Sequence, residues 1–181
     1  LRAGAGVSYG NRGDSPLHKR YGDAVKSANV QTSADFLQAL SSLPLFYEPG
    51  TQWEYSYGLD VAGLAVEAVT KQRLGEFLQE RLFTPLGMVD TSFVVPPAKA
   101  ARIARPLAVD PDTGRPTTFR MPVTPSHYDC GGGCAQSTAI DYLRFALMLL
   151  NHGALENTRV LGRKTVEYMT ANHLDADVDV S

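Results

Sequence analysis

The sequence lacks any apolar run long enough to cross a bilayer, and its first residues lack the charged and apolar regions of a secretion signal. It also lacks a concentration of positive charge, since 17 Lys and Arg stand against 19 Asp and Glu in a net charge of -2. Neither a membrane nor a nucleic acid is therefore an expected partner. Because the chain starts at Leu1 and not at Met, we expect a processed or excised piece, in which a removed leader would not be visible.

Cysteines and clustered metal ligands are also scarce. Only Cys130 and Cys134 are present, on either side of three glycines. A bridge between them is sterically possible but would close a very small loop, so we expect free thiols, which favour a reducing, cytoplasmic compartment. The histidines are scattered, without i, i+4 pairing or nearby carboxylates at ligand spacing; they are His18, His127, His152 and His173. Neither a metal nor another cofactor is expected.

The residues that are present suit a soluble globular protein. Hydrophobic residues make up 44% and charged residues 20% of the 181 positions, which argues against disordered and fibrous classes and allows a real core. No internal repeat and no linker interrupts the chain. We therefore expect a single domain over residues 1–181.

Apolar residues at three-and-four spacing predict several helices. Thr32 or Ser33 can cap a short one that stops before Pro44, and others are expected over 74–82 and 163–171. Thr138, with an acid three residues on, is typical of the start of a further helix that ends at Gly153. The apolar residues of the helix that ends at Gly153 are Ile140, Leu143, Met148 and Leu149. In the helix over 163–171 we expect Val166 and Met169 to face inward.

Residues 48–69 form the stretch around which the rest of the chain is expected to be arranged. Pro49 and Gly50 form a breaker-rich turn, aromatic residues follow, and apolar spacing from Leu59 onward predicts a helix with small residues that allow close packing. Tyr55 is therefore expected on a loop at the mouth of a helix, where free backbone N–H groups and the helix dipole favour a phenolate and suit a proton carrier. The structural alternative is a half-buried packing tyrosine.

Two glycine-rich segments need separate interpretation. Gly131, Gly132 and Gly133 indicate a sharp turn or a close approach, but they lack the spacing and the lysine of a phosphate-binding loop. Gly6 to Gly10 spell G-x-S-x-G around Ser8, without the strand before it and the helix after it that a nucleophile elbow needs. Residues 105–128 contain five prolines and no helical period, which predicts short strands or an irregular loop.

Three blocks carry a resemblance to a known family. They are P-G-T-Q-W-E-Y-S-Y-G-L-D-V-A-G, then F-L-Q-E-R-L-F-T-P-L-G-M-V-D-T-S-F, and later G-G-G-C-A-Q-S-T-A-I-D-Y-L-R-F-A-L-M-L-L-N. From about Val7 to Leu174 the chain resembles the serine β-lactamase-related family, which includes class C β-lactamases, carboxylesterases and acyltransferases. The resemblance implies the mainly α part of an α/β β-lactamase/transpeptidase-like fold, a helical region with irregular loops and short strands.

The same resemblance implies roles for individual residues. The family uses an S-x-x-K nucleophile helix, a Y-x-N motif and a late K-T-G or H-x-G strand; only the second is found here, with Tyr55 in the catalytic place and Tyr57 where asparagine is usual. This variant is more similar to the esterase and acyltransferase branch than to true β-lactamases. Lys164 to Val166 match K-T-G poorly and in a helical context. The chain then corresponds to a central fragment, inactive alone, in which Val123, Thr124 and Gly131 to Gly133 line the substrate pocket.

Several functions remain open at this point. The main hypothesis is a carboxylesterase that forms an acyl-serine intermediate from a small-molecule ester or amide. β-Lactamase and acyltransferase activities are close variants of it. A non-catalytic binding or scaffold module is the alternative from another class. A third reading, an α/β-hydrolase that uses Ser8 with His127 or His173, requires a buried strand before Ser8. The sequence predicts no oligomeric state.

Overall fold

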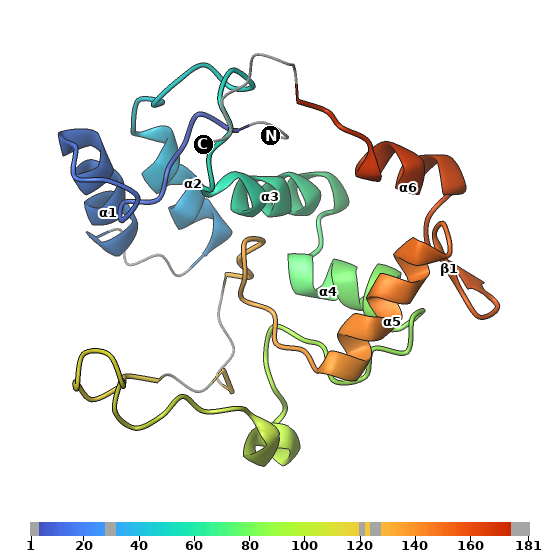
Figure 1. The fold of residues 1–181 in the computed structure, drawn as a ribbon. Helices are drawn as coiled ribbons and strands as arrows, with labels where there is room; N and C mark the ends of the chain where they lie inside the picture. Colours follow the sequence, from blue (N-terminus) through green and yellow to red (C-terminus); the bar gives the residue numbers. More distant parts are fainter. Residues whose placement is uncertain (1–3, 28–31, 120–121, 124–127, 175–181) are drawn as a thin grey trace.

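The computed structural model describes residues 4–27, 32–119, 122–123 and 128–174, and within them the structure is mostly helical (Figure 1). The α-helices are α1 (Pro16–Ser27), α2 (Ser33–Ser41), α3 (Gly58–Thr70), α4 (Leu74–Leu78), α5 (Ala139–Leu150) and α6 (Arg163–Thr170). A π-helix, η1 (Gln79–Phe83), continues α4, and a 3-10 helix, η2 (Pro97–Arg102), follows. No helix in the described ranges is both long and apolar enough to traverse a membrane.

Two helices begin with the side-chain caps that the sequence predicts. Thr32 starts α2 with a full capping box, since its side chain accepts from the Asp35 N–H and the Asp35 side chain accepts from the Thr32 N–H. Thr138 caps α5 by accepting from the Asp141 N–H. The Asp141 carboxylate accepts instead from the Asp90 N–H at 2.7 Å and from the Thr91 hydroxyl at 2.8 Å. Asp141 therefore ties α5 to the segment after η1.

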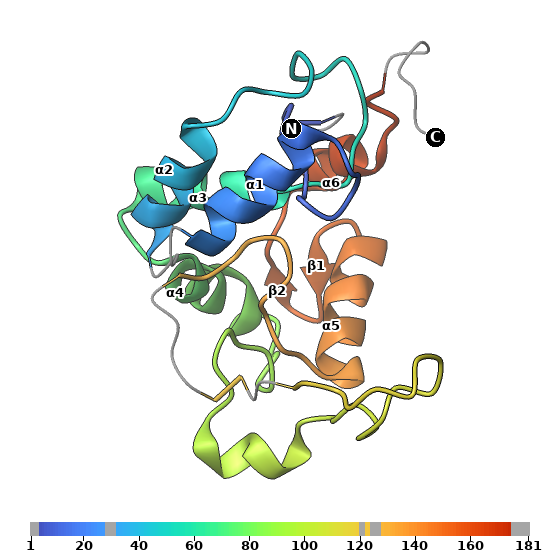
Figure 2. The same ribbon diagram turned by 90° about the vertical axis from the view of Figure 1, so that its left-hand side faces the viewer.

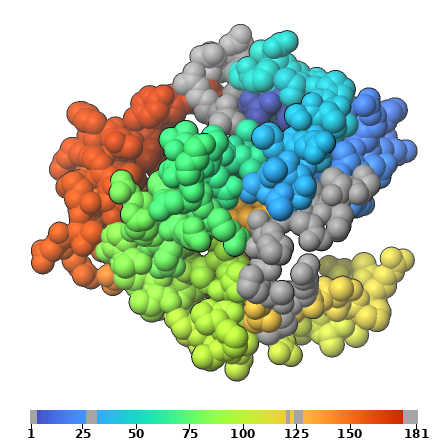
Figure 3. Space-filling view, turned by 180° about the vertical axis from the view of Figure 1, so that it is seen from behind, coloured from blue at the N-terminus to red at the C-terminus, as the bar shows by residue number. Residues whose placement is uncertain are grey.

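Helix α3 lies in the middle of the molecule (Figures 1 and 3). Seen from behind, its green residues separate the blue N-terminal helices from the red C-terminal part. It contacts α2 on one side and α4 on the other. A Cβ at Gly63 would come within 2.9 Å of the Leu74 side chain, so this glycine permits the close approach that the small residues predict.

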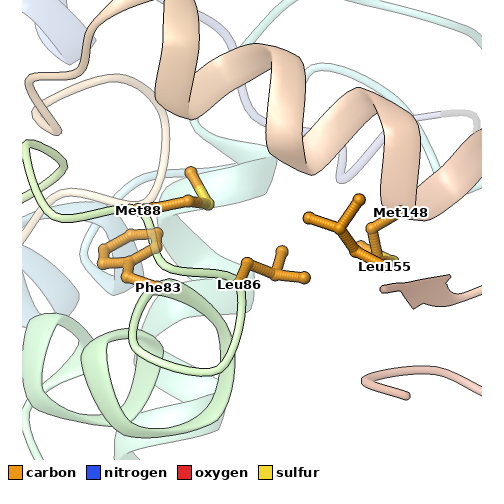
Figure 4. Packing of buried hydrophobic residues seen from close by; sticks show 5 residues of the cluster. All are labelled: Phe83, Leu86, Met88, Met148 and Leu155. Atoms are coloured by element: carbon orange, nitrogen blue, oxygen red, sulfur yellow. The ribbon is translucent and has the colours of Figure 1, made fainter. Parts of the chain in front are cut away.

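Two separate clusters form the core. One joins the N-terminal segment to α1 and α2 through Val7, Tyr21, Phe36 and Leu40. The other joins η1, the turn after it, α5 and the hairpin, and its buried members are Phe83, Leu86, Met88, Met148 and Leu155 (Figure 4). Both lie on the inward faces of helices, as burial of apolar surface requires.

Some elements differ from the sequence prediction. A two-stranded antiparallel sheet pairs β1 (Ala154–Leu155) with β2 (Thr158–Arg159), beside α5 (Figure 2). In α6, Val166 is buried as predicted, but Met169, which was also predicted to face inward, is 53% exposed. The prediction was wrong for Met169 because helical spacing defines an apolar stripe without identifying which part of it is covered by other elements.

Candidate functional site

The loop before α3 carries the tyrosine that the sequence singles out. Helix α3 starts at Gly58 with Tyr57 as its N-cap, so Tyr55 lies on the loop at the helix mouth, as predicted. Tyr55 is 57% exposed, whereas Tyr57 is only partly exposed and packs against the Phe36 ring. The exposed phenol is free to meet a molecule from outside the described chain.

A further tyrosine, Tyr9, supports this loop from the N-terminal segment. Its ring centroid lies 5.4 Å from that of Tyr55 and 4.3 Å from that of Tyr57, the latter edge-on. Such pairs add about 0.5–1.5 kcal/mol beyond the area they bury. In the sequence, Tyr9 stands within a glycine-rich segment, and none of its neighbours indicates a contact with the distant Tyr55 and Tyr57. Its supporting role could therefore not be predicted.

The neighbouring Ser8 is fully buried and its hydroxyl donates to the Glu54 carboxylate. No strand precedes Ser8 in the described residues, and the next helix starts only at Pro16. The context of a nucleophile elbow is thus missing, as the sequence predicts. Ser8 instead fastens the N-terminal segment to Glu54, directly before Tyr55. The rival pairing with His127 lies outside the described residues, and His173 bonds the Tyr168 carbonyl.

The glycine turn lies against the first turn of α3. A Cβ at Gly131 would come within 2.3 Å of the Leu59 carbonyl oxygen, and one at Gly132 within 2.6 Å of an Asp60 carboxylate oxygen. Asp60, only 5% exposed, accepts from the Gly132 N–H and from the Tyr128 hydroxyl, each at 3.1 Å. The predicted close approach is therefore found, and it brings Gly131 to Gly133 to the helix end that follows Tyr55.

The two cysteines beside this turn are joined. Cys130 and Cys134 form a disulfide with their Cα atoms 5.4 Å apart, and the expectation of free thiols was wrong. The glycines between them allow the tight loop, because residues without Cβ atoms reach conformations that other residues avoid. The prediction of a reducing compartment was based on free thiols, so it loses its basis.

A second buried carboxylate holds the turn from the other side. Asp129, 6% exposed, pairs with Arg73 at 2.6 Å and accepts from the Gly75 N–H at 3.0 Å, at the start of α4. The glycine turn is thus fixed to the N-terminal ends of both α3 and α4. Buried carboxylates that accept charge-assisted and backbone hydrogen bonds are strong anchors.

Burial sets the protonation of the tyrosines around the site. It raises the pKa of Tyr9, Tyr57 and Tyr128 above the ordinary value, and the Asp60 carboxylate raises each of them further. These three phenols therefore stay neutral at neutral pH and act as hydrogen-bonding and packing groups.

The remaining predicted pocket residues are less well connected. Val123 is half-buried in a turn, next to Pro122, whose carbonyl accepts from the Val95 N–H at 2.8 Å. Thr124 lies outside the described residues. The structure therefore brings together Tyr55, Tyr57 and the glycine turn, while Val123 lies beside the segment at Val95. Among the described residues no group of three or more His, Cys, Asp or Glu side chains is arranged to hold a metal ion.

Comparison with known proteins adds an independent finding. The family model described as Beta-lactamase matches residues 2–179. An uncharacterized protein of Mycobacterium tuberculosis is 34% identical over 172 residues, which cover 94% of this chain and 42% of that protein. Esterase EstB of Burkholderia gladioli is 40% identical over 85 residues, 47% of this chain and 20% of that protein.

A solved structure has the same arrangement of elements. Simvastatin synthase (LovD) from Aspergillus terreus matches with a TM-score of 0.71 and 27% identity, over 96% of this chain and 41% of that chain. The predicted fold class is thus confirmed. The chain spans less than half the length of each of these similar proteins.

Proposed function

Because the chain belongs to the β-lactamase family, as its motifs predict, we propose that it is the central part of a serine hydrolase, a carboxylesterase that works through an acyl-serine intermediate. The family contains esterases and acyltransferases, which supports a hydrolase at a coarse level. The observation that carries the finer proposal is Tyr55, an exposed phenol at the head of α3, beside a glycine turn tied to the same helix end.

In this proposal the chain contributes the proton carrier and part of the pocket wall, and the nucleophile comes from other residues. No S-x-x-K motif occurs in the 181 residues. The serine hydroxyl, from outside the chain, attacks the ester carbonyl, and Tyr55 together with a lysine passes the serine proton to the leaving alcohol. Water then attacks the acyl carbon of the acyl-serine, and Tyr55 accepts the water proton and passes it to the serine oxygen, so that the carboxylic acid leaves and the serine hydroxyl is restored.

Tyr57 is the residue that favours an ester over a β-lactam as the substrate. It fills the place in which the family more often has asparagine, and its ring packs between Tyr9 and Phe36. A packed phenol has no carboxamide to pair with an amide-type substrate. Tyr57 and Gly131 to Gly133 are proposed to line the pocket, with Val123 and Thr124 further along the chain.

An acyltransferase is the second candidate because it shares every step up to the acyl-serine and differs only in the acceptor. An alcohol in place of water would take the acyl group, and Tyr55 would accept the proton of that alcohol. Four of the similar proteins carry transferase names. A comparison of product ratios in water and in water with an added short alcohol separates the two activities.

Labelling with a fluorophosphonate tests the proposal. The 19.6 kDa chain should gain no adduct in an intact-mass measurement, because its one buried candidate, Ser8, is bonded to Glu54. The longer protein that contains the chain should gain one adduct, at a serine outside residues 1–181. An adduct at Ser8, or turnover of an activated ester by the 19.6 kDa species, would overturn the proposal; a longer protein that takes no adduct would favour the non-catalytic module.

A further inference from the structure

A cavity lies apart from Tyr55 and the glycine turn, between η2 and the segments that precede η2 and α5. Its volume is about 340 Å³, and none of its described lining residues belongs to the Tyr55 loop or the glycine turn. Ligand pockets in proteins have volumes of about 300–1,000 Å³. The cavity is therefore large enough for a small organic molecule and too small for a long chain.

Two cations and one carboxylate line one wall of this cavity. Lys99 contacts Asp90 at 2.7 Å, and the Arg102 guanidinium holds both oxygens of the same carboxylate at 2.9 and 2.8 Å. These contacts hold the pKa of Asp90 well below its ordinary value, so it is ionised at neutral pH. The lining therefore carries two positive charges and one negative charge, and the buried Asp141, which accepts from Thr91, lies close enough to interact with Arg102.

Both cations have hydrogen-bond donors beyond those used in these contacts. Lys99 has three ammonium N–H groups and spends two of them, on Asp90 and on the Val89 carbonyl at 2.7 Å. Arg102 has five N–H groups and spends two on Asp90. Lys99 and Arg102 can thus each donate to an additional acceptor.

Apolar side chains and hydrogen-bonded groups complete the lining. Val95, Ile103 and Phe119 line the cavity, and Phe119 is 42% exposed. Ser92 and Gln136, also lining residues, exchange two backbone hydrogen bonds at 3.0 and 2.8 Å. The hydroxyls of Thr91 and Ser137 lie 2.8 Å apart, and the buried Asp141 accepts from Thr91. A lining that is partly apolar and partly cationic suits a ligand with two different ends.

We propose that this cavity binds a small organic monocarboxylate, with its carboxylate against Lys99 and Arg102 and its apolar body against Phe119 and Val95. A planar carboxylate matches the donor geometry of a guanidinium, and its two oxygens can accept from the remaining N–H groups of Lys99 and Arg102. Inorganic phosphate has no apolar body for Phe119, and a neutral alcohol brings a single oxygen without the charge of a carboxylate. The site is separate from the proposed esterase site and does not depend on it.

Isothermal titration of the chain with benzoate tests the proposal, with benzyl alcohol and inorganic phosphate as comparison probes. We expect benzoate to bind at least tenfold more tightly than either, since charge-assisted hydrogen bonds are the stronger ones. Benzyl alcohol or phosphate that binds as well as benzoate would contradict the carboxylate-plus-apolar class. No benzoate binding at millimolar concentration would remove the site altogether.

Matched variants locate the binding. Lys99→Met should weaken benzoate binding about tenfold by removing one charged donor, the loss expected for a charge-assisted hydrogen bond. Lys164→Met should leave binding unchanged, because Lys164 is an exposed residue of α6 that pairs with Glu167. Phe119→Ala removes the aromatic part of the apolar lining without touching the charges and should weaken binding several-fold, which keeps the test open if Lys99→Met fails to fold. Unchanged affinity in both Lys99→Met and Phe119→Ala would place benzoate elsewhere and overturn the proposal.

Discussion

Tyr55 differs from the tyrosines around it in what surrounds its hydroxyl. Tyr9, Tyr57 and Tyr128 are partly buried, and burial together with Asp60 raises their pKa. Tyr55 keeps 57% of its surface exposed while its ring is supported by Tyr9. A phenol that reaches solvent on a supported ring is suited to proton transfer, whereas neutral buried phenols are suited to holding the site in shape.

The buried tyrosines predict how stability depends on alkaline pH. Their folded-state pKa values exceed the unfolded value of about 10, so the folded state holds phenolic protons more tightly than the unfolded state does. Their contribution is complete below about pH 10 and is lost as the pH rises toward the folded values. Urea unfolding at several pH values should give a free energy that falls above about pH 10; a free energy that is level or rises there would contradict this assignment.

The methionine pair in the last long helices predicts a contrast in stability. Met148 is fully buried among Phe83, Leu86 and Leu155, whereas Met169 is 53% exposed. Met148→Ala should lower the free energy of unfolding by about 3 kcal/mol, because it removes buried atoms and leaves a cavity. Met169→Ala, the matched control, should change it by less than about 0.5 kcal/mol. Similar losses in thermal or urea unfolding for both variants would contradict the burial in Figure 4.

Among the elements, α3 is the one that joins the core to the site. It packs against α2 and α4, and its first turn receives the glycine turn through Leu59 and Asp60. The glycine turn is held at the same time to the start of α4 through Asp129. A change at this contact should therefore affect stability and the shape of the proposed pocket together.

Substitution in the glycine turn tests that contact. Gly131→Ala would place a Cβ 2.3 Å from the Leu59 carbonyl oxygen, so the turn must move away from α3. We expect a loss of about 1–3 kcal/mol in stability, the usual cost of overpacking. Gly58→Ala, at the start of the same helix, meets only ordinary contacts at 3.7 Å or more and should cost little. Equal stability of Gly131→Ala and the parent in urea unfolding would show that the turn does not pack as described.

The sequence predicts the elements whose signals are local, and misses those that depend on distant contacts. The caps at Thr32 and Thr138 and the start of α3 were predicted because each depends on residues that are neighbours in the sequence. Helix α1 was missed although Leu17, Tyr21 and Val25 repeat every four residues. The hairpin of β1 and β2 has two residues in each strand, too few for an alternating pattern. The 3-10 helix η2 begins at the second of the two prolines Pro96 and Pro97, which predict only extended chain.

The features of the candidate site likewise fall into those with a local sequence signal and those that depend on contacts between distant residues. Tyr55, Tyr57 and the close approach of the glycines could be predicted because motif and helix start are local features. The role of Tyr9, the double anchoring by Asp60 and Asp129, and the disulfide depend on residues that meet only in the folded chain. A spacing of four residues between cysteines does not reveal whether the backbone between them turns back on itself.

At the scale of the whole molecule, the described helices expose large apolar side chains. They include Leu59 and Val69 of α3 and Ile140 and Leu150 of α5, which are between 65% and 82% exposed. Single-domain organisation stays a proposal, and these exposed apolar faces support the proposal that further polypeptide completes the enzyme.

Steady-state kinetics of Tyr55→Phe in the longer protein that contains this chain, with a short-chain activated ester, test the central claim most directly. Tyr142→Phe, an exposed tyrosine of α5, is the matched control. Loss of a proton carrier should lower kcat by about 10²–10³-fold with little change in KM, while Tyr142→Phe keeps the parent values. A Tyr55→Phe enzyme as active as the parent would remove Tyr55 from the mechanism and leave the chain with the fold of its family but without a demonstrated part in catalysis.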